Sequence, residues 1–461
     1  MRNTVGVKIN PTSMGRREFL RMLGAATVGA AGFTGLMGPF EFARAAITPG
    51  ETGIYITDMY RTKLNVGGVL VRLDTNKGIP GYGECRDVDP NSATELSGLK
   101  PLVLGMNPTQ VDKVFNAIRN YGNPQSDWRY QEEKTGGMCG IEMACWDITG
   151  KVYNVPVWKL IGPKLRDRVR LYCDTGQKNS STLPAAVQKR LNRGFTWFKA
   201  DMYLSSLCTQ GTDYTIASSP NSYGYRPITI NSSGYTKMEA YARQYRSLIG
   251  TQFPLSSDHY QGYNNFTSQL SVESAIELAN RMATSDCQGM SGGWLEDIID
   301  WGWKDGQGIP VIKQVTDQTN MPILAGEDMY CLDEYQAMVD EGAVDIIHPD
   351  EATAGGVHQT RLAAIYAHTK GVRTALHCTG SAFSYVASLH VAAGIPDFLA
   401  LEYHYIDDAS DSWYDSVVDG IEKPLIGNDG YAAVPGGPGL GITPNAAAMS
   451  AHGASTWSRV T

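Results

Sequence analysis

Apolar and polar residues alternate with a period of two in the segment that begins at Gly53. The runs Tyr55–Thr57, Val69–Leu73 and Gly81–Glu84 show this alternation, and turn residues separate them. A period of two bounded by turn residues is typical of half-buried β-strands. We therefore predict a small antiparallel sheet here.

From Pro101 to Gly150 the apolar period becomes helical. Ile141, Ala144, Cys145 and Ile148 recur at intervals of three and four residues, as on one face of an amphipathic helix. Sheet and helices together predict an N-terminal α+β domain over residues 46–165. Cys139 and Cys145 fit this helix as buried residues, without a disulfide.

From Arg168 onward, short apolar runs alternate with helical patterns such as Val272–Ala283 and Leu332–Gly342. This alternation predicts a (β/α) barrel, which we place at residues 166–425. A glycine-rich loop, Pro435–Gly441, indicates that segment 426–461 returns to the first domain. The eight strand candidates are Val169–Cys173, Trp197–Met202, Pro254–Ser257, Trp294–Glu296, Ile323–Ala325, Ile346–His348, Arg373–His377 and Phe398–Glu402.

One stretch interrupts this alternation. Residues 205–232 are polar and rich in Tyr, Ser and Asn, and they follow the second strand candidate. Long loops are often functional, and loops after barrel strands lie on the face where barrel active sites form. We expect a lid or a substrate-contact loop, with a surface insertion as the alternative.

Composition narrows the class of protein. The chain has 461 residues, of which 42% are hydrophobic and 19% charged, so it can bury a large core and is not globally disordered. Its 8 cysteines are too sparse for a disulfide scaffold. A net charge of -8 without a basic stretch argues against nucleic-acid binding.

The first 45 residues have the features of an export signal. Arg16 and Arg17 precede a short, weakly apolar run, 22–40, and a small-residue pattern at 43–45. This arrangement resembles a twin-arginine (Tat) signal peptide. We expect cleavage, a periplasmic or secreted protein, and no membrane association afterwards. The alternative, a membrane anchor, would need a longer apolar run.

Titratable residues follow the predicted strands. In a barrel the carboxyl ends of the strands converge on one rim, where several carboxylates repel one another unless a cation neutralises them. Mg²⁺ prefers such oxygen ligands. The rim residues are Asp258, Glu296, Glu327, Asp350, His377 and Glu402.

These residues and their spacing resemble the enolase superfamily, in its mandelate racemase-like branch, from about Gly53 to Gly441. The resemblance implies a (β/α)7β-type TIM barrel with an N-terminal α+β capping domain. It also implies a homo-oligomer. The motifs that carry it are Gly137–Lys151, Val155–Gly162, Leu295–Asp297, Gly326–Asp328, Asp345–Asp350 and Gly355–Val357.

The resemblance also implies roles for single residues. Asp258, Glu296 and Glu327 match three Mg²⁺ ligands, while Asp350 and His377 match the family's Asp–His dyad. Two further residues match family positions: Glu402 is the acid on the strand after the catalytic His, and Lys199 is the first Lys of a Lys-x-Lys motif. The second Lys is replaced by Asp201, so a base of that kind is absent.

The family reaction removes the proton next to a substrate carboxylate and forms an enediolate. A divalent cation stabilises the developing charge, and Lys199 would add positive charge at the same carboxylate. His377 is the leading base, since imidazole titrates near physiological pH, with Asp350 fixing its tautomer.

The first functional hypothesis is a Mg²⁺-dependent dehydratase of a sugar acid, aldonate or aldarate, that yields a 2-keto-3-deoxy acid. The acid for the leaving hydroxyl is His377 itself or Tyr260, with His259 as a second candidate. Strand alternation places residue 260 on the side of Asp258 and points His259 away. We expect substrate contacts from Arg61, Arg86, His259 and Asp328.

Two alternatives stay open. One is a racemase or epimerase of a hydroxy acid that uses Asp201 or Tyr260 opposite His377. The other is an exported sugar-acid binding protein without catalysis. All three hypotheses share a small-molecule carboxylate as the ligand.

Overall fold

The computed structural model describes residues 53–65, 67–86, 93–122, 131–259, 268–289, 292–299, 308–404, 415–454 and 456–461. They belong to one compact unit, Gly53–Thr461. The expected signal peptide, 1–45, lies outside the described residues, and so does Tyr260.

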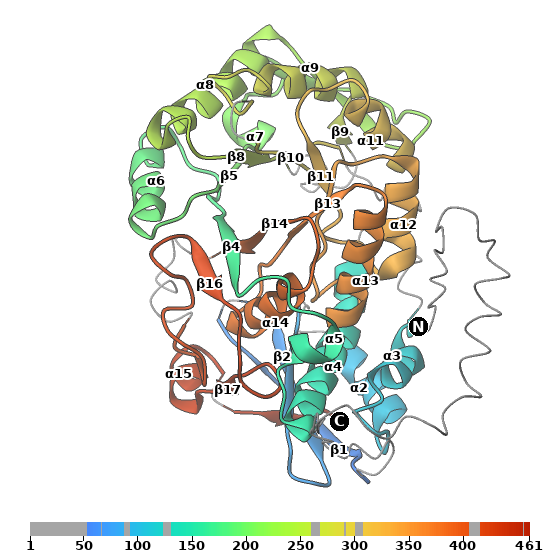
Figure 1. Ribbon diagram of the computed structural model, residues 1–461. Coiled ribbons are helices and arrows are strands. Elements are labelled where there is room, and N and C mark those ends of the chain that lie inside the picture. Colours follow the sequence, from blue (N-terminus) through green and yellow to red (C-terminus); the bar gives the residue numbers. More distant parts are fainter. Residues whose placement is uncertain are drawn as a thin grey trace, which may run out of the picture. The chain divides into compact units, whose positions relative to one another are not determined.

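Parallel strands close into a barrel in the described part of the chain (Figure 1). Pairing of the last strand with the first closes the ring, and β16 (Tyr431–Ala433) adds to the first strand in antiparallel orientation. The eight strands, in chain order, are β4 (Arg168–Cys173), β5 (Phe198–Asp201), β8 (Leu255–Asp258), β10 (Leu295–Glu296), β11 (Ile323–Ala325), β12 (Ile346–Ile347), β13 (Arg373–Leu376) and β14 (Phe398–Tyr403).

A helix follows each of the first seven strands, which confirms the predicted (β/α)7β fold. Each strand lies within two residues of its predicted bounds. The connecting helices are α6 (Leu183–Asn192), α8 (Ser232–Ile249), α9 (Val272–Met282), α11 (Ile309–Thr316), α12 (Cys331–Glu341), α13 (Gly356–Thr369) and α14 (Ala382–Ala393).

Side-chain caps explain where several of these helices begin. Asn231 accepts hydrogen bonds from two backbone amides at the start of α8, and Ser271 and Ser381 cap α9 and α14 in the same way. At the other end of α12, Gly342 takes a left-handed conformation with φ +67°. Such caps satisfy backbone groups that a helix end leaves without partners.

The N-terminal part forms the predicted antiparallel sheet, with strand order β18-β1-β2-β3. Helix α4 packs against β3 so closely that a Cβ atom on Gly81 or Gly83 would lie 2.1 Å from a helix carbonyl oxygen. Only glycine allows this approach. The elements are β1 (Ile56–Lys63), β2 (Val69–Thr75), β3 (Gly81–Cys85), α2 (Ala93–Val103), α3 (Val111–Ile118), α4 (Gln131–Tyr153) and β18 (Ser458–Arg459).

The predicted core positions of this part are correct. Ile141, Ala144, Cys145 and Ile148 on α4 are all fully buried. All eight cysteines are buried and free of disulfides, as expected for Cys139 and Cys145. No helix of the described chain has the length and apolar composition that crossing a membrane requires.

The polar insertion, residues 205–232, is not the irregular loop that the sequence suggested. It contains the short helix α7 (Leu204–Leu207) and the strands β6 (Tyr214–Ile216) and β7 (Arg226–Ile230), which join β9 (Ser268–Leu270) in a separate sheet. The β-branched and tyrosine residues at 214–216 and 226–230 are good strand formers. Its role as a lid stays a prediction.

The C-terminal segment packs against the end of α4. Gly439 exchanges backbone hydrogen bonds with Val155 and Val157, and the Leu440 amide donates to Asp147 at 2.9 Å. The remaining elements of these segments are α5 (Val157–Ile161), β15 (Val418–Asp419), β17 (Thr443–Pro444) and α15 (Ala446–Ala451).

A buried histidine on α14 forms hydrogen bonds with both α5 and the C-terminal segment. His390 on α14 accepts a hydrogen bond from the Trp158 amide through Nδ1 at 3.2 Å and donates to the Leu440 carbonyl through Nε2 at 3.1 Å. Burial lowers the pKa of His390 from 6.5 to about 4. The neutral ring is therefore the form that this contact needs.

We expect acid to weaken the fold through this residue. Because the unfolded chain binds a proton at His390 below pH 6.5 and the folded chain only near pH 4, stability falls between these values. The loss should reach about 3 kcal/mol. Urea unfolding from pH 7 to pH 4 should show a steeper decline for the native chain than for His390→Gln. Parallel curves would contradict this role.

Candidate active site

The interior of the barrel consists of an apolar layer beneath a polar one. The lower layer contains Tyr172, Trp197, Trp294, Leu324, Ile346, Ala375 and Ala400, from successive strands or the residues just before them. Side chains two positions apart on a strand share a face. The residues two positions further along therefore form the polar layer: Asp174, Lys199, Glu296, His348, His377 and Glu402, joined by Asp258 above Ser256.

Aromatic packing seals the floor of the site. The Trp197 and Trp294 rings lie 4.8 Å apart, and Tyr172 packs edge-on against Trp294 at 5.2 Å. The hydroxyl of Ser256 accepts a hydrogen bond from Trp197 Nε1 at 2.9 Å. The charged groups above this floor thus stand in a low-dielectric setting, where their interactions are strong.

Lys199 is the central cation of the polar layer. Its Nζ lies 2.8 Å from Glu296 Oε1 and 2.8 Å from Glu402 Oε1, and 3.8 Å from Asp258 Oδ2. Burial opposes its charge, but the carboxylates of Glu296 and Glu402 outweigh burial and raise the pKa of Lys199 well above its usual value. It therefore stays protonated and holds these acids together.

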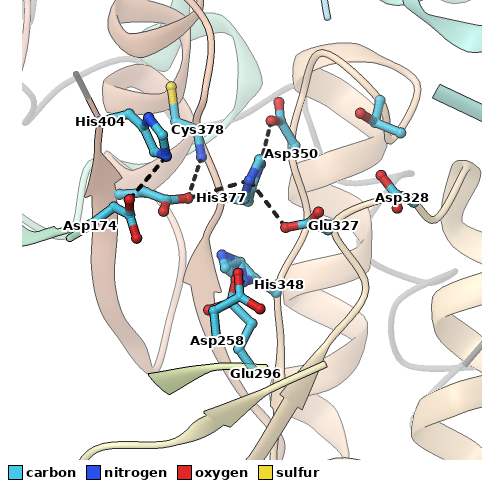
Figure 2. A network of polar contacts seen from close by, with 12 residues as sticks. Asp174, Asp258, Glu296, Glu327, Asp328, His348, Asp350, His377, Cys378 and His404 are labelled. Atoms are coloured by element: carbon cyan, nitrogen blue, oxygen red, sulfur yellow. Dashed lines mark hydrogen bonds and ion pairs between the residues drawn. The ribbon is translucent and has the colours of Figure 1, made fainter. Parts of the chain in front are cut away.

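His377, which follows β13, lies between carboxylates (Figure 2). Its Nδ1 is 2.7 Å from Asp350 Oδ2, and its Nε2 is 3.1 Å from Glu327 Oε2 and 3.4 Å from Glu402 Oε2. Burial disfavours the imidazolium, yet Glu327, Glu402 and the hydrogen bond to Asp350 raise the pKa of His377 to about 10. His377 can accept a proton at neutral pH only if another cation takes up the charge of Glu327.

Glu327 reaches the site through a turn after β11. Gly326 has φ +117°, a conformation that favours glycine, and Glu327 and Asp328 follow it. Burial would raise the pKa of Glu327, but His377 and Arg86 lower it to about 2. This acid is therefore ionised throughout the physiological range.

Arg86 brings a second cation from the N-terminal sheet. It follows β3, and its guanidinium lies 3.2 Å from Glu327 Oε1 and 3.1 Å from Asp328 Oδ1. It also donates to Thr353 Oγ1 at 3.4 Å. The N-terminal domain thus supplies a charge to the barrel rim, and Arg86 and Asp328, both expected at the substrate, lie together there.

A second His–Asp pair stands at the junction of β14 and β4. His404 Nε2 lies 3.2 Å from Asp174 Oδ2, and Figure 2 shows the pair apart from His377. Asp174, Glu402 and His404 have donor atoms that all lie within 4.8 Å of one another, and they form the one such group of three among the described residues. On β5, Asp201 Oδ2 accepts from Tyr203 at 2.7 Å.

The three expected metal ligands follow or end adjacent strands. Glu296 pairs in register with Asp258 on β8, and β10 pairs with β11, which precedes Glu327. Asp258 Oδ1 is buried and has no hydrogen-bond partner among the described residues. These three carboxylates, one of which has an unsatisfied oxygen, offer the hard oxygen donors that Mg²⁺ takes. In this structure Glu296 and Glu327 turn toward Lys199, Arg86 and His377.

Other expected residues lie elsewhere. His259 is buried with Nε2 2.8 Å from Ser257 Oγ, and burial lowers its pKa to about 3. Ser257 and His259 share the face of the strand opposite to Asp258, as alternation predicts, so His259 does not reach the acidic rim. Arg61 lies in β1, paired with Val71 and Ser458.

Three residues of the site, Asp174, His348 and His404, were not predicted from the sequence. Asp174 follows a predicted strand just as Asp258 ends one, so the same rule would have found it. His348 Nε2 lies 3.0 Å from the Tyr172 hydroxyl, and burial lowers its pKa well below its usual value. His404 follows Glu402 by two residues, and that spacing places both on one face.

Known families and structures match this chain over nearly all of its described length. Residues 59–162 match the mandelate racemase/muconate lactonizing enzyme N-terminal domain, and residues 183–448 match the enolase C-terminal domain-like family. A mandelate racemase/muconate lactonizing enzyme-like protein from Rubrobacter xylanophilus has a TM-score of 0.73 at 25% identity, covering 87% of this chain and 98% of its own.

The names of two relatives state a dehydratase reaction. The D-xylonate dehydratase of Haloferax volcanii is 29% identical over 403 residues, 86% of this chain and 88% of its own length. A D-galactonate dehydratase family member of Musicola paradisiaca is 26% identical over 396 residues, 82% of this chain and 89% of its own.

Removal of the central cation should destabilise the barrel. In Lys199→Met, Glu296 and Glu402 would stay buried without their partner, and we expect a loss of about 3 to 5 kcal/mol in the free energy of unfolding. The matched change Lys313→Met breaks a surface pair with Asp317 and should cost less than about 1 kcal/mol. Urea denaturation compares them, and equal losses would contradict the central role of Lys199.

Proposed function

This chain belongs to the mandelate racemase/muconate lactonizing enzyme family of the enolase superfamily, and we propose that it is a Mg²⁺-dependent dehydratase of a sugar acid. The observation that carries the proposal is the buried His377–Asp350 dyad beside the acidic strand ends. The two named relatives act on D-xylonate or belong to the D-galactonate dehydratase family, so we infer an aldonic or aldaric acid as substrate and a hydro-lyase reaction.

His377 would remove the proton next to the substrate carboxylate. Its Nδ1 is held by Asp350 at 2.7 Å, which leaves Nε2 as the atom that accepts the proton. The same contact fixes the ring and stabilises the imidazolium that forms. The resulting enediolate expels the β-hydroxyl, and the product is a 2-keto-3-deoxy acid and water.

Asp258, Glu296 and Glu327 would hold the metal ion. The chemistry that a bound Mg²⁺ supplies is stabilisation of the negative charge that develops on the substrate carboxylate. Sharing Glu327 with a cation would also weaken the contact that raises the pKa of His377. By holding the cation, these carboxylates would serve both the stabilisation of the enediolate and the basicity of His377.

Positive side chains would orient the substrate. Lys199 lies among the acids of the polar layer, and Arg86 points to Glu327 and Asp328. We propose that both contact the substrate carboxylate or its hydroxyls, with Asp328 and, from the N-terminal sheet, Arg61 as further contacts. Glu402 would position Lys199 and His377, which it touches on either side.

The epimerase alternative needs a second base. Asp201 is the candidate on the described strands, and burial and the neighbouring Asp174 raise its pKa well above the usual value. A raised pKa does not exclude a carboxyl as a general base. The names of the two relatives favour the dehydratase over the epimerase. A binding protein without catalysis would have no use for the His377–Asp350 dyad.

We expect the purified protein with Mg²⁺ to convert D-xylonate, D-galactonate or another acid of a sugar-acid panel. In D₂O, mass spectrometry and NMR should show loss of water and a new 2-keto group. Chelation by EDTA should stop the reaction, and His377→Asn should lower its rate by at least about 100-fold. α-Deuteration without water loss would indicate an epimerase. Binding that His377→Asn leaves intact, without turnover, would indicate a binding protein.

We also infer that residues 1–45 direct export of the folded chain to the periplasm or beyond. Support comes from the Arg16–Arg17 pair, the apolar run behind it and the small residues at 43–45. In a bacterial host the chain should appear outside the cytoplasm in a form shortened near Ala45. The double change Arg16→Lys, Arg17→Lys should keep it inside. Export of both forms, or of neither, would contradict a twin-arginine signal.

A further inference from the structure

The alternation that builds the polar layer continues one step further toward the barrel opening. His404 follows Glu402 by two residues, and the register of β14 with β4 pairs Tyr403 with Cys173. The next residues on both strands are therefore neighbours, which explains the 3.2 Å contact between His404 Nε2 and Asp174 Oδ2. Two strands that only barrel closure brings together thus build a second His–Asp pair.

We propose that His404, held by Asp174, is the general acid that protonates the departing β-hydroxyl. This rests on the proposed dehydratase function and assigns the acid that the sequence left open between His377, Tyr260 and His259. His377 would then only take the α-proton, and His404 would give a different proton to the leaving oxygen.

The exposure of the two imidazoles suits these separate tasks. The side chain of His377 is 3% exposed and that of His404 is 31% exposed. A base that takes a proton from carbon gains from exclusion of water. An acid that must recover its proton after each turnover gains from contact with solvent.

Both imidazoles also lie close to Glu402. His377 Nε2 lies 3.4 Å from Glu402 Oε2, while the donor atoms of Asp174, Glu402 and His404 lie within 4.8 Å of one another. One carboxylate thus neighbours both histidines. Adjacent carbons of one substrate, the α- and β-carbons, can face two groups placed in this way.

The acids around His404 also contact a cation. Lys199 Nζ lies 2.8 Å from Glu402 Oε1 and 4.0 Å from Asp174 Oδ1, so its ammonium group offsets part of their negative charge. Asp174 contacts His404 through Nε2, whereas Asp350 contacts His377 through Nδ1. The proton that His404 gives to the leaving oxygen would therefore come from Nδ1.

The α-C–H bond breaks, and His377 Nε2 takes the proton while the electron pair enters the enediolate. That pair forms the bond between the α- and β-carbons as the β-C–O bond breaks with its own electrons. The leaving oxygen takes a proton from the His404 imidazolium and departs as water. The enol becomes the 2-keto acid, His377 releases its proton, and His404 takes one from solvent.

The test compares His404→Asn with the native enzyme on D-xylonate, D-galactonate and 3-deoxy-3-fluoro-D-xylonate in D₂O with Mg²⁺. Water loss should fall at least about 100-fold, whereas deuterium should still enter the α-position of recovered substrate. Fluoride leaves without a proton, so its release should stay within about threefold of native. Asp174→Asn should show the same pattern more weakly.

His368→Asn is the matched control, because His368 forms an exposed pair with Asp397 on the surface and should leave all three rates unchanged. Unimpaired water loss in His404→Asn would overturn the acid role and leave the proposed function standing. Parallel loss of exchange, water loss and fluoride release would also overturn it, in favour of a structural or ion-binding role. A native enzyme without turnover of any acid would remove the proposed function and this role together.

Discussion

The buried contact of Lys199 with Glu296 and Glu402 is the interaction on which the rest of the site depends. Period-two alternation along the barrel strands brings acids to one rim, and these acids would repel one another without a cation. The ammonium, 2.8 Å from each of the two carboxylates, makes their burial possible. The aromatic floor beneath excludes water and strengthens every charge interaction above it.

The N-terminal domain contributes to the site and is joined to the barrel by hydrogen bonds of two buried glutamate side chains. Glu84 accepts hydrogen bonds from the Ser381 and Ser384 amides at the start of α14, and Glu142 accepts from those of Val357 and His358 at the start of α13. Glu84 lies on β3, and Glu142 lies on α4, which packs against β3. The two contacts together hold β3 in place, and Arg86, directly after β3, therefore reaches Glu327.

The sequence predicts the barrel well because each strand is a short apolar run and each rim residue ends or follows one. All eight strands follow from that pattern, and the α4 core face follows from its helical period. The pairing of His377 with Asp350 was implied by the resemblance to the enolase superfamily. The polar composition of the insertion suggested a loop, but β6 pairs with β7 inside the insertion and β7 pairs with β9 outside it. Likewise, His404 meets Asp174 only through closure of β14 on β4, and Arg86 reaches the rim only through domain packing.

In the proposed enzyme, one rim of the barrel holds both the metal ion and the α-carbon of a sugar acid. A crystal structure with Mg²⁺ and an inert analogue such as D-xylonohydroxamate tests this most directly. We expect the ion among Asp258, Glu296 and Glu327, with the α-carbon about 3 to 3.5 Å from His377 Nε2. An ion held instead by Asp174, Glu402 and His404, or an analogue bound away from His377, would contradict it.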